Sequence, residues 1–309
     1  MPTATQLKLS ILIPAYNYPA GVLRIVSPIL AENRRDIEIL VHDDSTDDSV
    51  EACMQQLAKL HPELSYVRNS PARGAIGNWN NLLERARGRY AMLIHHDDFP
   101  LSETFASDLL AELEKSGWPD AVILSCLAYN VTRKETRACI CNPIRSFIAK
   151  RMPFYLFRRN VIGPPSVLVV RQGLFAGYDA KLKWLVDVEG YFHFLKSRSR
   201  RLFFSRLMMV SSTGLPGAIS TSIRDNIEEI TEAELAYIET KYPEMKSRAL
   251  SSFPRTAYAL SEKIVWAMIR ATSLLCRIIM RPPTYAAVLR REQSSLEVDH
   301  PKERTIDAA

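Results

Sequence analysis

The sequence has few cysteines and lacks any long apolar run. Only five cysteines occur among 309 residues, at irregular spacing, which excludes a disulfide framework and predicts a reduced protein. Cys139 and Cys141 form a single C-x-C pair, which is half of the four ligands that zinc takes. No segment reaches the roughly 20 apolar residues that cross a bilayer, and the N-terminus lacks the pattern of a signal peptide. We therefore expect a cytoplasmic protein.

Concentrated positive charge is also missing from most of the chain. The stretch from Met245 to the end holds eleven Lys or Arg against six Asp or Glu, so it carries +5 of the net charge of +6. A nucleic-acid-binding face requires a basic patch or stripe, and the nearly neutral first 244 residues do not supply one. We therefore expect no nucleic-acid partner, whereas the basic tail suits an anionic membrane surface.

Short apolar runs alternate with segments of helical periodicity over the first 126 residues. The pattern predicts strands at 9–13, 37–41, 65–68, 90–94 and 121–126, and helices at 20–33, 45–60, 75–86 and 103–115. Ser45 or Thr46 is expected to cap the second helix, and Gly88 to end the third. This alternation is typical of a mostly parallel sheet with helices on both faces, so the predicted fold class is α/β.

We expect the chain to divide into a main domain at 1–215 and a helical extension at 216–309. Within the main domain, 1–126 is regular, whereas 127–215 is irregular, rich in aromatic and basic residues, and has expected strands at 167–170 and 202–204 and a helix at 187–195. Residues 256–281 form an amphipathic pattern with three cations seven residues apart, and the polar tail follows. Such a helix either packs on the domain or lies in a membrane interface.

Pairs of aspartates follow two of the predicted strands. Asp43 and Asp44 follow the second, and Asp97 and Asp98 follow the fourth. The carboxyl ends of parallel strands meet at one edge of a sheet, where α/β folds bind their ligands. Crowded like charges cost stability unless a cation lies among them, and Mg²⁺ or Mn²⁺ with a nucleoside diphosphate meets that need. The alternative is that each Asp is a turn or cap residue.

Five motifs occur in a fixed order between residues 9 and 195. They are LSILIPAYN at 9–17, EILVHDDSTDDS at 38–49, GAIGNWNNLLERARGRY at 74–90, LIHHDD at 93–98 and PPSVLVVRQGLFAGYDAKLKWLVDVEGYFHFL at 164–195. In order and spacing the chain resembles family 2 glycosyltransferases of the GT-A fold. The resemblance implies a nucleotide-binding half at 1–126 and an acceptor half at 127–215.

The resemblance also implies an activity and a set of site residues. It implies inverting transfer of a sugar from a nucleoside-diphosphate sugar to a glycan or lipid-linked acceptor, in surface polysaccharide or glycoconjugate biosynthesis. Asp98 would bind the divalent cation, and Asp187 would be the general base, with Glu189 as its substitute. The residues implied to bind the donor are Pro14, Ala15, Tyr16, Asn17, Asp43, Asp44, Arg73, Asn78 and Asp97.

The sequence departs from the family pattern at three places. Asp44 is followed directly by Ser45 and Thr46, whereas many relatives have a glycine between the paired acids and these residues. His95 stands where relatives often have Asp, and 211–221 lacks the late His that some relatives use as a metal ligand. Whether His95 or His96 contacts the metal is left open. A sugar-1-phosphate nucleotidyltransferase is a second interpretation, although PAYN replaces the glycine-rich basic loop that it needs after the first strand. A non-catalytic sugar-nucleotide-binding protein is the third.

Overall fold

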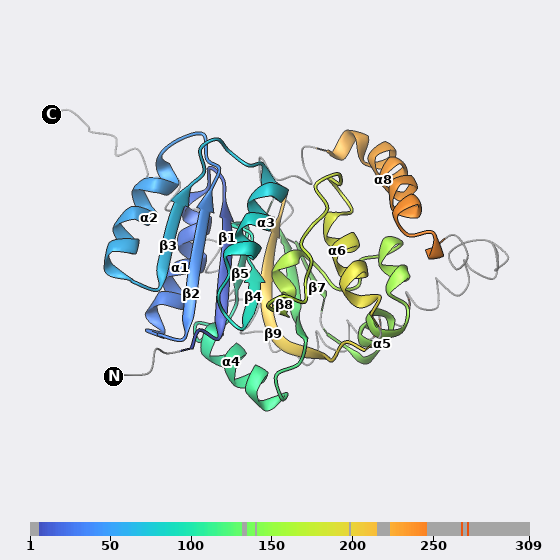
Figure 1. The fold of residues 1–309 in the computed structure, drawn as a ribbon, viewed down its shortest axis with the longest axis horizontal. Coiled ribbons are helices and arrows are strands. Elements are labelled where there is room, and N and C mark those ends of the chain that lie inside the picture. Colours follow the sequence, from blue (N-terminus) through green and yellow to red (C-terminus); the bar gives the residue numbers. More distant parts are fainter. Residues whose placement is uncertain are drawn as a thin grey trace.

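The computed structural model describes residues 6–131, 135–139, 141–197, 199–214 and 223–245, together with Ala267 and Ala271. Its described part is built on a sheet of nine strands flanked by helices (Figure 1). The strands are β1 (Leu9–Ala15), β2 (Ile37–Asp43), β3 (Leu64–Arg68), β4 (Tyr90–Leu93), β5 (Asp98–Pro100), β6 (Ala121–Asn130), β7 (Glu135–Cys139), β8 (Leu168–Arg171) and β9 (Leu202–Thr213). The helices are α1 (Pro19–Ala31), α2 (Ser49–Leu60), α3 (Ala75–Arg85), α4 (Phe105–Lys115), α5 (Pro143–Arg151), α6 (Val186–Leu195) and α8 (Ile227–Lys241).

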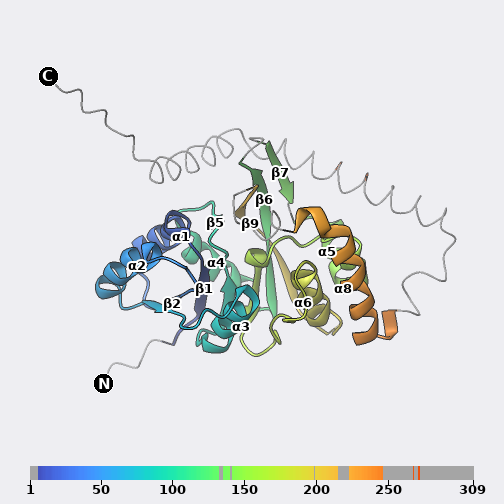
Figure 2. The same ribbon diagram turned by 90° about the horizontal axis from the view of Figure 1, so that it is seen from above.

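The first half of the sheet is parallel, as predicted, in the order β3-β2-β1-β4. Every residue of β1 and β2 is buried, because α1 and α3 cover opposite faces of these strands (Figure 2). From β1 the chain runs outward to β2 and β3, and then returns to place β4 on the other side of β1. This reversal of strand order opens a crevice at the carboxyl ends of β1 and β4, where α/β folds bind ligands.

The second half of the sheet is mixed. β8 pairs antiparallel with both β4 and β6, whereas the long strands β6 and β9 pair in parallel. The short strand β5, which the sequence pattern does not predict, pairs antiparallel with β9 and places Asp98 opposite Ser211. One of the candidate metal ligands is therefore held by backbone pairing rather than by a free loop.

Two predicted helix ends are wrong. The helix α2 begins at Ser49, with Asp48 as its N-cap residue, because Ser45 instead donates to the Asp43 carboxylate and Thr46 bonds to Asn17. The helix α3 ends at Arg85, and Ala86 is already extended. Gly88 packs on β1 instead, where an added Cβ would lie 2.6 Å from the carbonyl carbon of Leu9.

The predicted extension at 216–309 is described only in part. Helix α8 lies beside α6, at the end of the molecule opposite α2 (Figure 1), and Ile238, Tyr242 and Met245 join the hydrophobic core. The amphipathic segment at 256–281 lies outside the described residues apart from Ala267 and Ala271. Within the described part of the chain, no helix has the length and apolarity to cross a membrane. The division into 1–126, 127–215 and 216–309 stays a prediction.

Helix α1 packs closely against the loop after β4 at Gly21. A Cβ added there would lie 2.1 Å from the carbonyl oxygen of His96 and 2.4 Å from the Tyr18 ring. Gly21→Ala should therefore destabilise the protein by about 1–3 kcal/mol, because either the loop after β4 or the helix must move. Chemical denaturation measures this loss.

The control is Gly77→Ala in α3, where the nearest contact of the new Cβ is an ordinary 3.4 Å from Arg73. Alanine is favoured over glycine in a helix by roughly 0.5–1 kcal/mol, so this variant should be slightly stabilised. A Gly21→Ala protein as stable as Gly77→Ala would contradict the close approach.

Candidate functional site

One cavity of about 800 Å³ opens at the carboxyl ends of β1, β2 and β4. Asp44 from the end of β2, Asp97 and Asp98 from beyond β4, and Asp187 from α6 all line it. The other predicted site residues in its wall are Pro14, Ala15, Tyr16 and Asn78. The sequence-based expectation that aspartates from separate segments share one cleft therefore agrees with the structure.

Asn17, Asp43 and Arg73 are also predicted to contact the donor, but they are not among the described residues that line the cavity. Asp43 is fully buried and accepts hydrogen bonds from the Ser45 amide at 2.8 Å and the Tyr66 hydroxyl at 2.8 Å. Asn17 joins the loops after β1 and β2: its amide donates to Ser45 Oγ and its Oδ1 accepts from the Thr46 amide, each at 2.8 Å. In this structure these residues shape the turns that carry Tyr16 and Asp44.

Asp44 is held at the cavity wall by the segment before α3. Its carboxylate accepts from Asn69 Nδ2 at 2.8 Å and from the Arg73 amide at 3.1 Å. Asn78 of α3 donates to the His42 carbonyl at 2.9 Å, which ties the helix to the end of β2. The Arg73 side chain is exposed and donates to Asn69 Oδ1 at 3.2 Å. Asp44 therefore has a fixed orientation and still faces the cavity.

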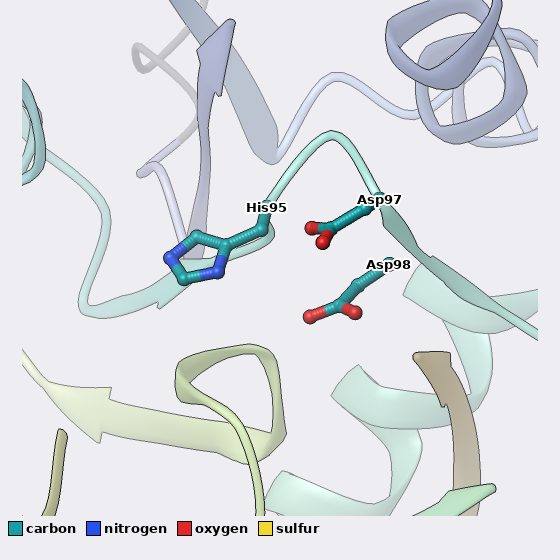
Figure 3. Close-up of side chains that lie close together, drawn as sticks. All are labelled: His95, Asp97 and Asp98. Carbon is teal, nitrogen blue, oxygen red and sulfur yellow. The ribbon is translucent and has the colours of Figure 1, made fainter. Parts of the chain in front are cut away.

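Figure 3 shows Asp97, Asp98 and His95 gathered after β4, with the imidazole beside the two carboxylates. One ligand atom from each of the three residues lies within 4.8 Å of the others. Burial and the adjacent charge of Asp97 raise the pKa of Asp98 to about 8. Carboxylate oxygens are the ligands that Mg²⁺ and Mn²⁺ prefer. This crowded acidic group therefore fits a divalent cation, which would relieve the repulsion.

The two histidines have different surroundings. His96 Nδ1 lies 3.1 Å from the Pro14 carbonyl oxygen, and its ring meets Tyr18 edge-on. The His95 ring stacks on Trp79, with 4.4 Å between ring centroids, and burial lowers its pKa to about 4. A neutral imidazole thus lies beside the two acids, whereas His96 is engaged with the loop after β1.

Asp187 stands in the first turn of α6, on the wall formed by the second half of the chain. Its carboxylate accepts from Asn160 Nδ2 at 2.8 Å and from the Val188 amide at 2.8 Å. Burial raises its pKa to about 6, although the Val188 amide and the Asn160 side chain oppose the rise. A carboxylate with a pKa near the working pH is suited to accept a proton.

The proposed substitute base has a different environment. Glu189 is buried, bonds to the Tyr242 hydroxyl and lies 2.8 Å from Lys241 Nζ. It is not among the described residues that line the cavity. Asp187 is therefore the carboxylate of α6 that faces the site.

Sequence reasoning missed the residues that orient the acids. Ser166 donates its hydroxyl to Asp98, and Asn160 holds Asp187 while accepting the amides of Ile162 and Gly163. Neither lies in a periodic segment, and each is more than 25 residues from its partner. Only the folded chain brings these pairs together.

The chain matches a family of known proteins over more than half of its length. The sequence model of the family described as "Glycosyl transferase family 2" matches residues 10–182. The chain is 31% identical over 96 residues to the GalNAc(5)-diNAcBac-PP-undecaprenol beta-1,3-glucosyltransferase of Campylobacter jejuni, covering 31% of each protein. It is 28% identical over 107 residues to the UDP-Glc:alpha-D-GlcNAc-diphosphoundecaprenol beta-1,3-glucosyltransferase of Escherichia coli, covering 34% of this chain and 42% of the relative. These matches span about a third of the length of the first curated relatives.

Solved structures share the fold at low sequence identity. Staphylococcus aureus TarS 1-349 in complex with UDP-GlcNAc has a TM-score of 0.53 and 14% identity, covering 70% of this chain and 61% of that one. The mannosyltransferase PcManGT from Pyrobaculum calidifontis, in complex with GDP-Man and Mn²⁺, has a TM-score of 0.50 and 15% identity, covering 96% and 88%. These likenesses confirm the fold class predicted from the sequence.

The buried Asp98 predicts a pH-dependent stability in EDTA. An unfolded Asp loses its proton near pH 4, whereas folded Asp98 keeps its proton up to about pH 8. The folded state therefore binds the extra proton between these values, and stability falls as pH rises through that window. Asp98→Asn cannot ionise, so its melting temperature should exceed that of the wild type at pH 8 and match it at pH 4.

The exposed Asp225 supplies the control, since Asp225→Asn should track the wild type at every pH. Differential scanning fluorimetry across the window measures all three proteins. If the melting temperatures of the wild type and of Asp98→Asn changed with pH in the same way, this would contradict the raised pKa of Asp98.

Proposed function

Because the chain belongs to glycosyl transferase family 2 and has its GT-A fold, we propose that it transfers a sugar from a nucleoside-diphosphate sugar to a hydroxyl acceptor, with inversion. The observation that carries the proposal is the convergence of Asp44, Asp98 and Asp187 on one cavity. Each acid comes from a different segment, and each is oriented by hydrogen bonds to neighbouring groups.

The donor would bind across the ends of β1 and β2. Tyr16 is 47% exposed at the cavity, so its ring is available to stack on a nucleotide base. Asp44 would accept from the N–H edge of the base, with Asn17, Asp43 and Asn78 fixing the two loops. Arg73 would approach the phosphates from the start of α3. Two solved structures of similar fold are complexes with UDP-GlcNAc and with GDP-Man, which supports a nucleotide-sugar donor with either uracil or guanine as its base.

The divalent cation, Mg²⁺ or Mn²⁺, would be held by Asp98. Asp97 beside it would contact the sugar or ribose, and the neutral His95 completes the polar wall. When bound, the cation would neutralise the negative charge on a departing diphosphate. The carboxylates position the donor, and Ser166 keeps Asp98 aimed at the cavity.

Asp187 would accept the proton of the acceptor hydroxyl as its oxygen attacks the anomeric carbon. Asn160 and the Val188 amide orient the carboxylate toward the cavity. Burial keeps its pKa near 6, so the group is ionised and able to accept a proton at neutral pH. One displacement without an enzyme nucleophile inverts the anomeric configuration.

The acceptor would enter along the wall from the second half of the chain. Arg158, Arg159, Lys183 and Trp184 line that wall, and they combine positive charge with an aromatic surface on which a sugar can pack. Two relatives carry undecaprenol-linked diphosphate acceptors in their names. Together these observations support a lipid-linked saccharide as the acceptor, used in surface polysaccharide or glycoconjugate biosynthesis.

Such an acceptor resides in a membrane, so we further propose a cytoplasmic protein that associates peripherally with the inner face of the cell membrane. The basic amphipathic segment at 256–281 would supply the contact, because cations near an anionic leaflet each contribute about 1 kcal/mol.

Asp187→Asn should lower sugar transfer by roughly 10²–10⁴-fold, the usual contribution of a general base. Binding of UDP or GDP should stay within two-fold of wild type, since Asp187 lies on the wall opposite the base site. In the wild type, transfer should rise with pH through about 6, where Asp187 ionises, and then level off. Full transfer by Asp187→Asn would remove this residue from the mechanism.

Flotation on vesicles that contain anionic lipid tests the membrane contact. The full chain should float with these vesicles, whereas a chain ending at Arg255 should stay at the bottom of the gradient. With neutral vesicles, both chains should stay at the bottom. Equal partition of both chains on anionic vesicles would contradict a role for 256–281.

A further inference from the structure

Helix α8 is tied to the segment that leads into α6. Lys241 Nζ lies 2.6 Å from an Asp179 carboxylate oxygen and 2.8 Å from one of Glu189. The Tyr237 hydroxyl donates to Asp179 at 2.8 Å, and the Tyr242 hydroxyl donates to Glu189. Charged and aromatic side chains at the C-terminal end of α8 and just after it thus form ion pairs and hydrogen bonds with both ends of the 179–189 stretch, which contains Asp187.

Glu234 lies at the centre of this contact, and its surroundings are unusual for a carboxylate. It is only 7% exposed, and a buried carboxylate is costly unless hydrogen bonds replace its water. Three successive backbone amides supply them: Lys183 and Leu185 donate at 2.5 and 2.7 Å, and Trp184 donates at 3.2 Å to either oxygen. No other carboxylate in the described part of the chain is shown accepting three successive amides.

These amides belong to the bend that precedes the first turn of α6. Leu185 is the N-cap residue of α6, and Lys183 and Trp184 precede it. A negative charge at this end of a helix interacts favourably with the helix dipole. Glu234 therefore fixes the start of α6 from outside. Lys183, Trp184 and Leu185 line the cavity, and Asp187 follows two residues later, so the same carboxylate sets the acceptor wall and the base.

We propose that Glu234 is a positioning residue, which holds the 183–185 bend and through it places Asp187 and the acceptor wall. The proposal rests on the proposed function and makes α8 part of the transfer site, although it comes from the predicted extension beyond residue 215. Glu234 touches no reacting atom in this assignment. Its effect passes through the backbone of the bend.

A glutamine tests the charge and the pattern of acceptors with little change of shape. Its amide keeps one oxygen, but its NH₂ group would face the backbone N–H groups of the bend. At least one hydrogen bond would therefore be replaced by a repulsive contact between two donors. Glu234→Asp keeps the carboxylate on a shorter stem and should recover part of the effect. Glu232→Gln removes an exposed carboxylate from the same helix and is the matched control.

Hydrogen exchange of the full chain gives the first readout, which needs no substrate. In Glu234→Gln the amides of 183–190 should exchange at least ten-fold faster, while β1 and β2 keep their protection. Calorimetry with UDP or GDP and Mn²⁺ should give dissociation constants within two-fold of wild type, which also shows that the variant is folded. Unchanged exchange at 183–190 would overturn the proposal.

Release of nucleoside diphosphate from UDP-GlcNAc and GDP-mannose, with a polyprenyl-diphosphate saccharide as acceptor, gives the second readout. Displacing a catalytic group by about 1 Å costs up to about 10²-fold, so kcat should fall 10- to 100-fold and acceptor KM should rise, with donor KM unchanged. Glu234→Asp should recover part of kcat, and Glu232→Gln should equal wild type.

The outcomes separate the two claims. An active wild type with an equally active Glu234→Gln would overturn this inference and leave the proposed function intact. A wild type that turns over neither donor would reject the proposed function, and the inference with it. If Glu234→Gln fails to bind nucleotide, the Glu234→Asp protein decides: wild-type kcat together with wild-type exchange would overturn the proposal.

Discussion

The cost of ionising the buried Asp98 beside Asp97 is the constraint on which this site depends. Asp97 and Asp98 sit together after β4, and Asp98 is almost fully buried, with its pKa raised to about 8 by burial and the neighbouring charge. Such an arrangement lowers the stability of the ligand-free fold, and natural proteins retain destabilising groups chiefly where function needs them. A cation bound together with a diphosphate would offset this cost. Its binding would explain why acids from three separate segments meet at one site.

The fold holds these acids in place by connections between distant segments. The strand reversal between β1 and β4 opens the crevice, and β5 pins Asp98 against β9 through backbone pairing. Ser166 and Asn160 then orient Asp98 and Asp187. Helix α8 adds an outer support through Glu234. The proposed donor side is thus built on the parallel sheet, whereas the proposed acceptor side depends on loops that contact a later helix.

The sequence was sufficient to predict the parallel half from local periodicity, and the meeting of Asp44 with Asp98 from the shared edge of parallel strands. The place of Asp187 at the same site was implied only by the resemblance to family 2 glycosyltransferases. It did not predict β5, nor the antiparallel partners of β8, since strand pairing depends on contacts distant in the chain. Ser45 shows the same limit at short range: its hydroxyl was expected to cap a helix but bonds to Asp43. Glu234 lies 49 residues from Leu185, and no local pattern marks that pair.

If Asp98 binds a divalent cation shared with a nucleoside diphosphate, calorimetric titration will show that nucleotide binding depends on both the cation and Asp98. UDP and GDP would be titrated into the wild type and into Asp98→Ala, each with Mn²⁺ and with EDTA. One nucleotide should bind the wild type at least ten-fold more tightly with Mn²⁺ than with EDTA, and Asp98→Ala should lose this difference. Equal affinity of each nucleotide for both proteins, with Mn²⁺ and with EDTA, would contradict this role of Asp98.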